Sequence, residues 1–280
     1  MSSPIRVLLT GATGYLGRYL VEQSRAPARP GEPGLEVRTA GRAGCDHAVD
    51  LAVRSAIAPL VDAVRPDVVL HAGAVSSIAA CEAAPGIAQA VNVHATAELC
   101  ARAPAVVYVS TDLVFGGDRA PYGVRDPVRP LSVYGRSKAA GEEAVLASAR
   151  GVVVRVPLLF GRSFDGRRGA TDMIRAAAAD DREVTLFVDE FRTPLHVADA
   201  AALLLSLCRV VGAGGDAPRI VHAPGRERLS RFELGRRFAE CSGVRARMRG
   251  APCTDPLRPK DVALAGEPVG RDLAAALADA

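Results

Sequence analysis

Short apolar runs alternate with segments of helical spacing along the first 160 residues of the chain. The apolar runs are continuous, which is typical of strands covered on both faces of a sheet. They lie at Ile5–Leu9, Leu35–Thr39, Asp67–Leu70, Ala105–Ser110 and Gly151–Val156. Helical spacing between them is found at Arg18–Ser24, Ser55–Val64, Pro85–Arg102 and Tyr134–Ala149. This order predicts an α/β fold with a Rossmann-type, doubly wound parallel sheet.

The pattern changes after about residue 160, where predicted helices become more prominent and strands short. Helices are expected at Thr171–Ala179, Val197–Arg209 and Ser230–Ser242, the last opening with the capping box Ser230-x-x-Glu233. Strands are expected at Glu183–Phe187 and Arg219–His222. We therefore predict two parts: a Rossmann domain over residues 1–160 and a smaller α/β lobe over residues 161–280, interleaved with the first.

Composition excludes several classes of protein. With 280 residues and 49% hydrophobic content the chain can bury a large core. A net charge of +4 suits an anionic ligand, but it is far from the charge of a nucleic-acid binder. Only 4% of residues are aromatic, so a base-stacking surface is not expected either. The six cysteines are scattered without zinc-ligand spacing, and we expect reduced thiols and no metal.

Membrane and secretion signals are not expected in this chain. The apolar stretches are broken well short of a membrane span, and Met1–Pro4 leads directly into the first strand without a signal peptide. We therefore expect a soluble, cytoplasmic protein with no membrane partner.

The glycines of Gly11-x-x-Gly14-x-x-Gly17 lie between the first predicted strand and a helix. The spacing differs from the G-x-G-x-x-G dinucleotide fingerprint by one extra residue in the first gap. Glycines permit a tight turn and close backbone approach, and a helix N-terminus presents free N–H groups to a pyrophosphate. A glycine turn without a ligand is the alternative, which the strand-to-helix setting disfavours.

The end of the second strand carries Arg42 where an NAD site would normally show an acidic residue. A guanidinium is suited to a 2′-phosphate, so this position favours NADP(H) over NAD(H). Because arginine is abundant in the chain, a solvated Arg42 is the alternative. Asp50 and Leu51 follow the next short segment and could contact the adenine edge.

Tyr134 and Lys138 are separated by one helical turn, and Lys138 is one of only two lysines in the chain. On a helix these positions share a face, so the ammonium can lie near the phenol. A nearby cation lowers the pKa of a phenol toward the range where it exchanges protons at neutral pH. An exposed amphipathic turn is the bland alternative for an isolated pair of this kind.

Two further polar positions are candidates for the same site. Thr111 follows Ser110 at the carboxyl end of a predicted strand, where its hydroxyl could hydrogen-bond a substrate carbonyl; a simple turn or cap is the alternative. Asn92 lies in the middle of a predicted helix, where asparagine has poor propensity. A polar role toward the site and a satisfied buried amide are equally compatible with it.

These motifs together resemble the extended short-chain dehydrogenase/reductase family, and within it the dTDP-4-dehydrorhamnose reductases and related sugar-nucleotide reductases. The similarity spans about residues 5–205, and Arg258–Leu264 is similar to a C-terminal R-P-x-x-x-x-L signature. The ordered motifs are T-G-A-T-G-Y-L-G, H-A-G-A, C-E-A-A-P, V-N-V, S-T-D-L-V-F-G, P-L-S-V-Y-G-R-S-K-A-A-G-E and R-V-P-L-L-F-G.

The resemblance implies a catalytic set. Tyr134 would protonate a carbonyl oxygen while NADPH delivers hydride, and Thr111 would orient that carbonyl. Lys138 would hold the nicotinamide ribose and depress the pKa of the tyrosine. Asn92 matches a helix asparagine that organises the lysine and a proton-relay water. The residues 1–160 would then bind NADP and the residues 161–280 the substrate, and a homodimer is a family-based expectation.

The same resemblance extends to binding residues. The expected cofactor contacts are Gly11, Thr13, Gly14, Tyr15, Leu16, Gly17, Arg42, Asp50, Leu51, Ala72, Gly73, Ala74, Tyr134, Lys138 and Pro157. The expected substrate contacts are Ser76, Asp112 and Arg192. Arg162, Arg167 and Arg168 are further candidates to hold a substrate diphosphate, with a solvated surface position as the alternative for each.

Some segments depart from the reductase pattern. The stretch after Gly161 lacks an Asn-Phe pair, and Asp189–His196 differs from the more usual D-Q-x-G-x-P-T. The latter is similar to a version found in a non-catalytic regulatory relative of methionine adenosyltransferase. Leu113 follows Asp112, whereas sugar-nucleotide 4,6-dehydratases carry an Asp-Glu pair there to eliminate water. Carbonyl reduction is therefore favoured over dehydration.

The leading hypothesis is an NADPH-dependent reductase of the 4-keto group of a dTDP-linked deoxysugar. Two alternatives stay open: a non-catalytic NADP-binding regulator or scaffold, and a reductase or epimerase of a keto substrate that is not a sugar nucleotide.

Overall fold

The computed structural model describes residues 3–280. Met1 and Ser2, which begin the segment expected to carry no signal peptide, lie outside the described residues. The chain forms two compact units. Unit 1 holds the chain up to Thr111 together with Ser132–Arg155 and Ala201–Val221. Unit 2 holds Asp112–Leu131, Val156–Ala200 and His222–Ala280. The assignment of cofactor binding and substrate binding to two parts of the chain stays a prediction.

Unit 1 is built on a seven-stranded sheet in the order β11-β6-β5-β4-β1-β2-β3. The strands are β1 (Ile5–Thr10), β2 (Leu35–Gly41), β3 (His47–Ala48), β4 (Val68–His71), β5 (Val106–Thr111), β6 (Gly151–Val156) and β11 (Ile220–His222). The pairs β1–β2, β1–β4, β2–β3 and β4–β5 are parallel. The order reverses between β1 and β4, as in a doubly wound Rossmann sheet, which confirms the predicted fold class.

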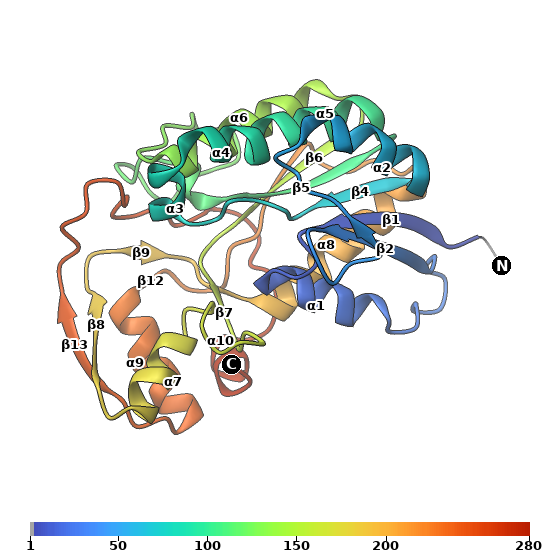
Figure 1. Ribbon diagram of the computed structural model, residues 1–280. Coiled ribbons are helices and arrows are strands. Elements are labelled where there is room, and N and C mark those ends of the chain that lie inside the picture. Colours follow the sequence, from blue (N-terminus) through green and yellow to red (C-terminus); the bar gives the residue numbers. More distant parts are fainter. Residues whose placement is uncertain (1–2) are drawn as a thin grey trace. The chain divides into compact units, whose positions relative to one another are not determined.

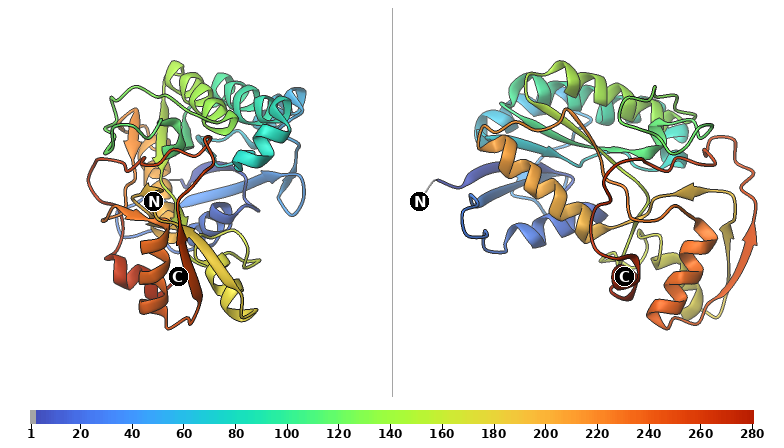
Figure 2. Two further views of the ribbon diagram at one scale, coloured as in Figure 1. Left: turned by 90° about the vertical axis from the view of Figure 1, so that its left-hand side faces the viewer. Right: turned by 180° about the vertical axis from the view of Figure 1, so that it is seen from behind.

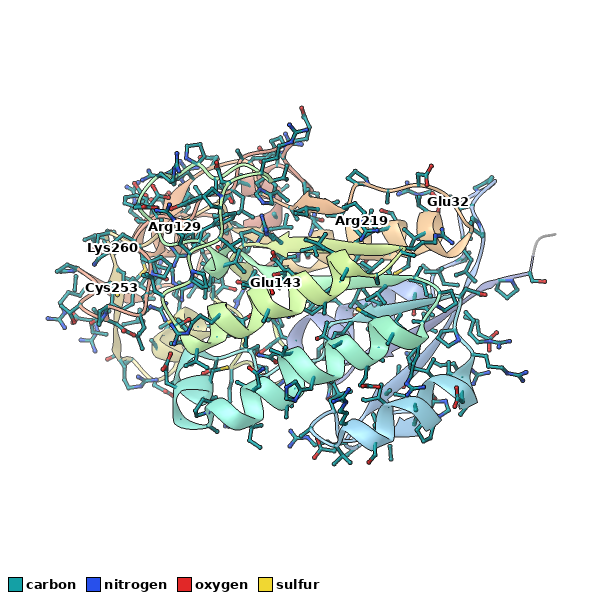
Figure 3. All side chains as sticks on the ribbon, turned by 90° about the horizontal axis from the view of Figure 1, so that it is seen from above. Glu32, Arg129, Glu143, Arg219, Cys253 and Lys260 are labelled. Carbon is teal, nitrogen blue, oxygen red and sulfur yellow. The ribbon has the colours of Figure 1, made fainter. Side chains whose placement is uncertain are left out.

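Helices cover both faces of this sheet. They are α1 (Tyr15–Ser24), α2 (Ile57–Val64), α3 (Ile78–Ala83), α4 (Pro85–Gln89), α5 (Ala95–Arg102), α6 (Val133–Ala147) and α8 (Val197–Gly212). Figure 1 shows α2, α4, α5 and α6 over one face and α1 on the other, and the rear view in Figure 2 shows α8 along that second face in gold. From above, in Figure 3, α6 lies beside the helices α4 and α5, with Glu143 on its outer surface.

The central strands are buried on both faces, as their continuous apolar runs predict. Leu8, Val69, Val106 and Val153 of four strands join one core cluster with residues of α2 and α5. The prediction of two covered faces is wrong for β2, in which only Ala40 is buried. Its single long neighbour is β1, because β3 on its other side has only two residues.

Several element boundaries differ from the sequence expectation. Helix α1 begins at Tyr15 and not at Arg18, because Gly14 already serves as its N-cap. The segment predicted as one helix from Pro85 to Arg102 contains a π-helical turn at Ala90–His94 between α4 and α5. Helix α3 was not predicted. A 3₁₀ turn at Arg54–Ala56 leads into α2.

Unit 2 contains shorter elements around its own core. They are a 3₁₀ turn at Asp112–Val114, β7 (Leu159–Phe160), α7 (Asp172–Ala179), β8 (Glu183–Phe187), β9 (Phe191–Arg192), β10 (Leu195–His196), β12 (Leu229–Ser230), α9 (Arg231–Ser242), β13 (Arg247–Ala251) and α10 (Leu273–Ala278). Phe160, Ile174, Leu186 and Phe238 are buried together in its core cluster. The capping box of Ser230 and Glu233 at the start of α9 is present, as predicted.

A strand forms within the expected residues Arg219–His222, but it joins the central sheet and not the smaller lobe where we expected it. As β11 it pairs with β6 in the central sheet, and Ala201–Val221 belongs to unit 1.

All six cysteines are free. None of the helices formed by residues 3–280 combines the length and hydropathy that a bilayer crossing requires.

Replacing Gly17 by Ala tests the packing of the glycine turn. A Cβ at Gly17 would lie 2.0 Å from the carbonyl oxygen of Gly11 and 2.8 Å from Ala12, both backbone contacts that cannot rotate away. We expect a loss of about 1–3 kcal/mol in the free energy of unfolding, measured by urea denaturation. Gly86→Ala is the matched control, since nothing lies within 4 Å of its Cβ position in α4. Equal stability of the two variants would contradict this account.

Candidate active site

The turn between β1 and α1 is shaped by its glycines. Gly11 has a φ of +76°, which favours glycine, and its carbonyl oxygen accepts a hydrogen bond from the Gly14 amide at 3.0 Å. A Cβ on Gly11 would lie 2.6 Å from the amide nitrogen of Gly73, at the end of β4. A Cβ on Gly73 would in turn lie 2.7 Å from Leu51. The backbone at Gly11 and the backbone at Gly73 therefore approach each other, and the Leu51 side chain packs against Gly73, because neither glycine has a side chain.

This arrangement fits a dinucleotide. Gly14 caps α1 with no side-chain hydrogen bond, and the first turn of α1, all of it within the described chain, holds no acidic residue. That turn therefore places no carboxylate of its own beside its N–H groups, and such a helix N-terminus suits an anionic pyrophosphate. A Cβ on Gly44 would lie 3.8 Å from Thr13, so the loop after β2 approaches the same turn. Arg42 lies exposed in that loop.

The other expected binding residues lie in loops and at the start of α1. Asp50 is exposed, and its carboxylate accepts a hydrogen bond from the Ala52 amide at 2.9 Å, so it caps its own turn. Tyr15 and Leu16 are half-buried at the start of α1, and Ala72 and Ala74 flank Gly73 after β4. Ser76, which was expected to contact the substrate, is exposed just before α3, and Pro157, an expected cofactor contact, is buried in unit 2.

Three of the four expected catalytic residues lie on β5 and α6. Thr111 is the last residue of β5 and is buried. Tyr134 and Lys138 lie one turn apart at the beginning of α6, with exposed fractions of only 9% and 3%. The Ser132 hydroxyl caps this helix by accepting the Gly135 amide at 3.1 Å. The bland alternative of an exposed helix turn is therefore wrong, since both side chains are buried.

Asn92 connects the π-helical turn to α6. Its Oδ1 accepts the Val75 amide at 2.8 Å, and its Nδ2 donates to the Val75 carbonyl at 3.1 Å and to the Ser137 hydroxyl at 2.9 Å. Ser137 then donates to the carbonyl oxygen of Tyr134 at 2.8 Å. The amide is thus fully satisfied and also joins the loop after β4 to the turn that carries Tyr134.

A directed chain of buried hydrogen bonds runs through His71 of β4. The Thr96 hydroxyl donates to the Asn92 carbonyl at 2.8 Å, so its oxygen accepts from Nε2 of His71 at 3.0 Å. Nδ1 of His71 then accepts from the Thr10 hydroxyl at 2.6 Å, which itself accepts the Gly73 amide at 3.2 Å. The network assigns the neutral Nε2–H tautomer. Burial, with a smaller contribution from the Lys138 charge, lowers the pKa of His71 to about 3.

Lys138 is buried against an aromatic ring. Its Nζ lies 3.9 Å from the ring centroid of Tyr108 on β5. Burial lowers the pKa of Lys138 to about 7, although Glu142 and then Cys81 act to raise it. The other lysine, Lys260, is bound differently: its ammonium donates to the Asp189 carboxylate at 2.6 Å and to the Cys253 carbonyl (Figure 3).

A buried ion pair supports the same helix. The Glu142 carboxylate accepts from Arg155 of β6 at 2.7 Å and from the Ser110 hydroxyl at 2.5 Å. Both charged side chains are almost fully buried. These contacts tie α6 to β5 and β6 and use the acceptor capacity of Glu142.

In unit 2, Asp112 and Arg192 are buried in a cluster of charges. Arg192 donates to Glu190 at 2.7 Å and to the carbonyl oxygens of Phe191 and Pro259, and its Nε lies 3.5 Å from the Asp112 carboxylate. Arg192 therefore has a fixed position and internal partners, and its contact with a substrate stays a prediction. The candidates Arg162, Arg167 and Arg168 are all exposed.

The structure adds residues that the sequence did not single out, namely His71, Tyr108, Ser137 and Glu142. No local pattern identifies them, because each acts through a partner distant in sequence. The order of the motifs H-A-G-A and S-K was visible, but not the hydrogen bonds that join them.

The reversed strand order, the glycine turn after β1 and the buried tyrosine and lysine on α6 define a Rossmann-type protein of the extended short-chain dehydrogenase/reductase class. A family model described as the RmlD substrate binding domain matches residues 5–275. The chain belongs to this family.

Proteins with different names are similar to this chain. dTDP-4-dehydrorhamnose reductase of Mycolicibacterium smegmatis is 33% identical over 262 residues, which cover 91% of this chain and 74% of that protein. Methionine adenosyltransferase 2 subunit beta of Rattus norvegicus is 30% identical over 249 residues, which cover 84% and 71%. The crystal structure of dTDP-4-dehydrorhamnose reductase from Bacillus anthracis in complex with NADP has a TM-score of 0.82 at 21% identity, covering 98% of this chain and 97% of that chain.

The buried His71 predicts a specific pH dependence of stability. In the unfolded chain it takes up a proton below about pH 6.5, whereas in the fold its pKa of about 3 keeps it neutral. Protons bind the unfolded state more, so stability falls as the pH drops. We expect His71 to account for about 2 kcal/mol of lost stability between pH 7 and pH 5.

Urea denaturation of wild type and His71→Asn at both pH values measures this difference. The loss between pH 7 and pH 5 should be about 2 kcal/mol smaller in the variant. His94→Asn, at an exposed histidine, is the control and should follow the wild type. Equal losses in wild type and His71→Asn would mean that His71 is protonated in the fold.

Proposed function

We propose that this protein is an NADPH-dependent reductase of the 4-keto group of a dTDP-linked deoxysugar. The observation that carries the proposal is the burial of Tyr134 and Lys138 one turn apart on α6, beside the strand that ends in Thr111. The membership of the RmlD substrate binding domain family and the relatives named dTDP-4-dehydrorhamnose reductase support the substrate class.

In this proposal Tyr134, Thr111 and Lys138 of unit 1 each have a separate role in carbonyl reduction. When bound, NADPH supplies the hydride that becomes bonded to the carbonyl carbon. Tyr134 donates its phenolic proton to the carbonyl oxygen, so a ketone becomes a secondary alcohol with atoms and charge balanced. Thr111 orients the carbonyl by a hydrogen bond. Lys138 holds the ribose hydroxyls of the cofactor and stabilises the phenolate that Tyr134 becomes.

Asn92 has a supporting role in the same proposal. Its amide holds Ser137, which lies in the turn between Tyr134 and Lys138, and Val75 in the loop after β4. The asparagine therefore fixes α6 relative to the loop where the cofactor is expected. The glycine turn at Gly11 and the N-terminus of α1 would hold the pyrophosphate.

The preference for NADP(H) over NAD(H) is part of the proposal and rests on Arg42. Its exposed side chain follows β2 in a loop that approaches Thr13 through Gly44, and a guanidinium suits a 2′-phosphate. The approach of this loop to the glycine turn makes an adenosine ribose at Arg42 compatible with a pyrophosphate at α1.

A second candidate function is a non-catalytic NADP-binding subunit. The observation that favours it is the 30% identity to methionine adenosyltransferase 2 subunit beta. Such a subunit requires the glycine turn but no proton donor. A stable complex with a methionine adenosyltransferase, together with no oxidation of NADPH in the presence of a dTDP-4-keto sugar, would favour this function over the first.

Replacing Tyr134 by Phe tests the proposed reduction. The ring stays in place but the proton donor is lost, so turnover should fall by about 10²-fold or more. NADPH affinity should change little. The measurements are NADPH oxidation with dTDP-4-dehydrorhamnose and calorimetric titration with NADPH.

Tyr19→Phe on α1 is the matched control, and it should keep wild-type turnover. Full activity of the Tyr134→Phe protein would exclude Tyr134 as the acid. A wild-type protein that binds NADPH but shows no turnover would contradict the proposed reduction itself.

Replacing Arg42 by Ala tests the cofactor preference. Loss of a guanidinium from a 2′-phosphate should weaken NADPH binding about tenfold or more and leave NADH binding nearly unchanged. Calorimetric titration of both cofactors measures the ratio. Arg25→Ala, at an exposed arginine after α1, is the control. An equal effect of Arg42→Ala on both cofactors would show that the side chain does not bind the 2′-phosphate.

A further inference from the structure

The ammonium of Lys138 is a buried cation whose partner is an aromatic ring. Lys138 is 3% exposed, and its Nζ lies 3.9 Å from the ring centroid of Tyr108, which is fully buried. Within residues 3–280, no carboxylate oxygen lies within 4.0 Å of this nitrogen and no hydrogen bond from it is formed. This contrasts with Lys260, which has both a carboxylate and a carbonyl.

The ring of Tyr108 is held in one place by its neighbours. A Cβ on Gly141 of α6 would lie 2.2 Å from the Tyr108 hydroxyl, so the ring occupies the space that this glycine leaves open. The His71 ring lies on another side, with 5.6 Å between the ring centroids. Since β5 and α6 both fix the ring, its face is a rigid surface for the lysine.

The charged and titratable groups around this pair are engaged elsewhere or carry no charge. Cys100 of α5 is one of them, and burial raises the pKa of its thiol to about 11, so it stays neutral. Glu142 on α6 is engaged by Arg155 of β6 and by Ser110 of β5. His71 of β4 is neutral, Cys81 of α3 donates its thiol to the Val75 carbonyl, and Tyr134 precedes Lys138 by one turn. The negative face of the Tyr108 ring is therefore the nearest compensation for the charge of Lys138.

We propose that Tyr108 is a positioning residue for Lys138: its ring face holds the ammonium beside Tyr134 and leaves N–H donors available for the ribose hydroxyls of the cofactor. A carboxylate in that place would use those donors and neutralise the charge that the phenolate needs. A ring face compensates part of the charge and occupies no N–H donor in a hydrogen bond to an oxygen atom. The inference rests on the proposed function for the identity of the acceptors.

The test uses the fact that the chain has only two lysines. Protein labelled with ¹³C at the lysine ε-carbon gives two resonances, and Lys260→Arg assigns them. The variants compared are Tyr108→Phe, which keeps the ring face, and Tyr108→Met, which keeps an apolar side chain without it. We expect the pKa of Lys138 in Tyr108→Met to lie about one pH unit below that in Tyr108→Phe. Lys260 should titrate identically in both.

A second measurement connects the ring to turnover. The kcat/KM for the dTDP-4-keto sugar should be close to wild type in Tyr108→Phe. In Tyr108→Met it should be about tenfold lower at pH 8, with the alkaline limb moved to lower pH. Equal pKa values of Lys138 in the two variants, or equal pH profiles, would overturn the inference.

A variant with an altered ring covers the case in which Tyr108→Met does not fold. Pentafluorophenylalanine at position 108 keeps the shape of phenylalanine but removes the negative face, and it should lower the pKa of Lys138 relative to Tyr108→Phe. If it does not, the inference is wrong. The titration needs no turnover, so a shift of the Lys138 resonance in a protein that reduces no keto sugar would contradict the proposed function and not the ring contact.

Discussion

The requirement that buried polar groups find partners fixes the ends of the central strands. His71 lies in the middle of the sheet with no access to water, and both of its ring nitrogens are used. Through Thr10 and Gly73 it orients the backbone where the glycine turn begins, and through Thr96 it reaches the π-helical turn of Asn92. The segments that would hold the cofactor and the helix that carries Tyr134 are thereby set by one chain of hydrogen bonds.

The buried charges near this network differ in the partners that they contact. The Glu142–Arg155 pair is satisfied by several hydrogen bonds, which is the condition under which a buried pair is tolerated. Lys138 is about as buried, but its ammonium contacts the face of the Tyr108 ring, and no carboxylate of the described residues lies within 4.0 Å of it. The chain thus pairs the charges that hold α6 in place with opposite charges, and within residues 3–280 it gives the ammonium one turn from Tyr134 only an aromatic ring face as its partner within 4 Å.

Much of the fold was predictable because its signals are local. The continuous apolar strands, the glycine turn and the capping box of Ser230 each lie within a few residues. The exposure of β2 was not predictable, since it depends on the shortness of the neighbouring β3. The role of Tyr108 was not predictable for a similar reason. In an apolar strand a tyrosine is expected to be a core residue, and its contact with Lys138, thirty residues later, is formed only in the folded chain. The π-helical turn likewise depends on tertiary contacts of Asn92 with Val75 and Ser137.

The free-energy cost of burying the Lys138 ammonium distinguishes the two candidate functions. A subunit that only binds a dinucleotide needs glycines for backbone approach and a helix N-terminus next to them, both of which this chain has. It does not need a buried ammonium without a carboxylate, because burial of such a charge opposes folding. The low pKa of Lys138 is a measure of that opposition. A chain that otherwise uses arginine for nearly all of its cations keeps a lysine at this costly position, and proton transfer by Tyr134 gives that charge a use.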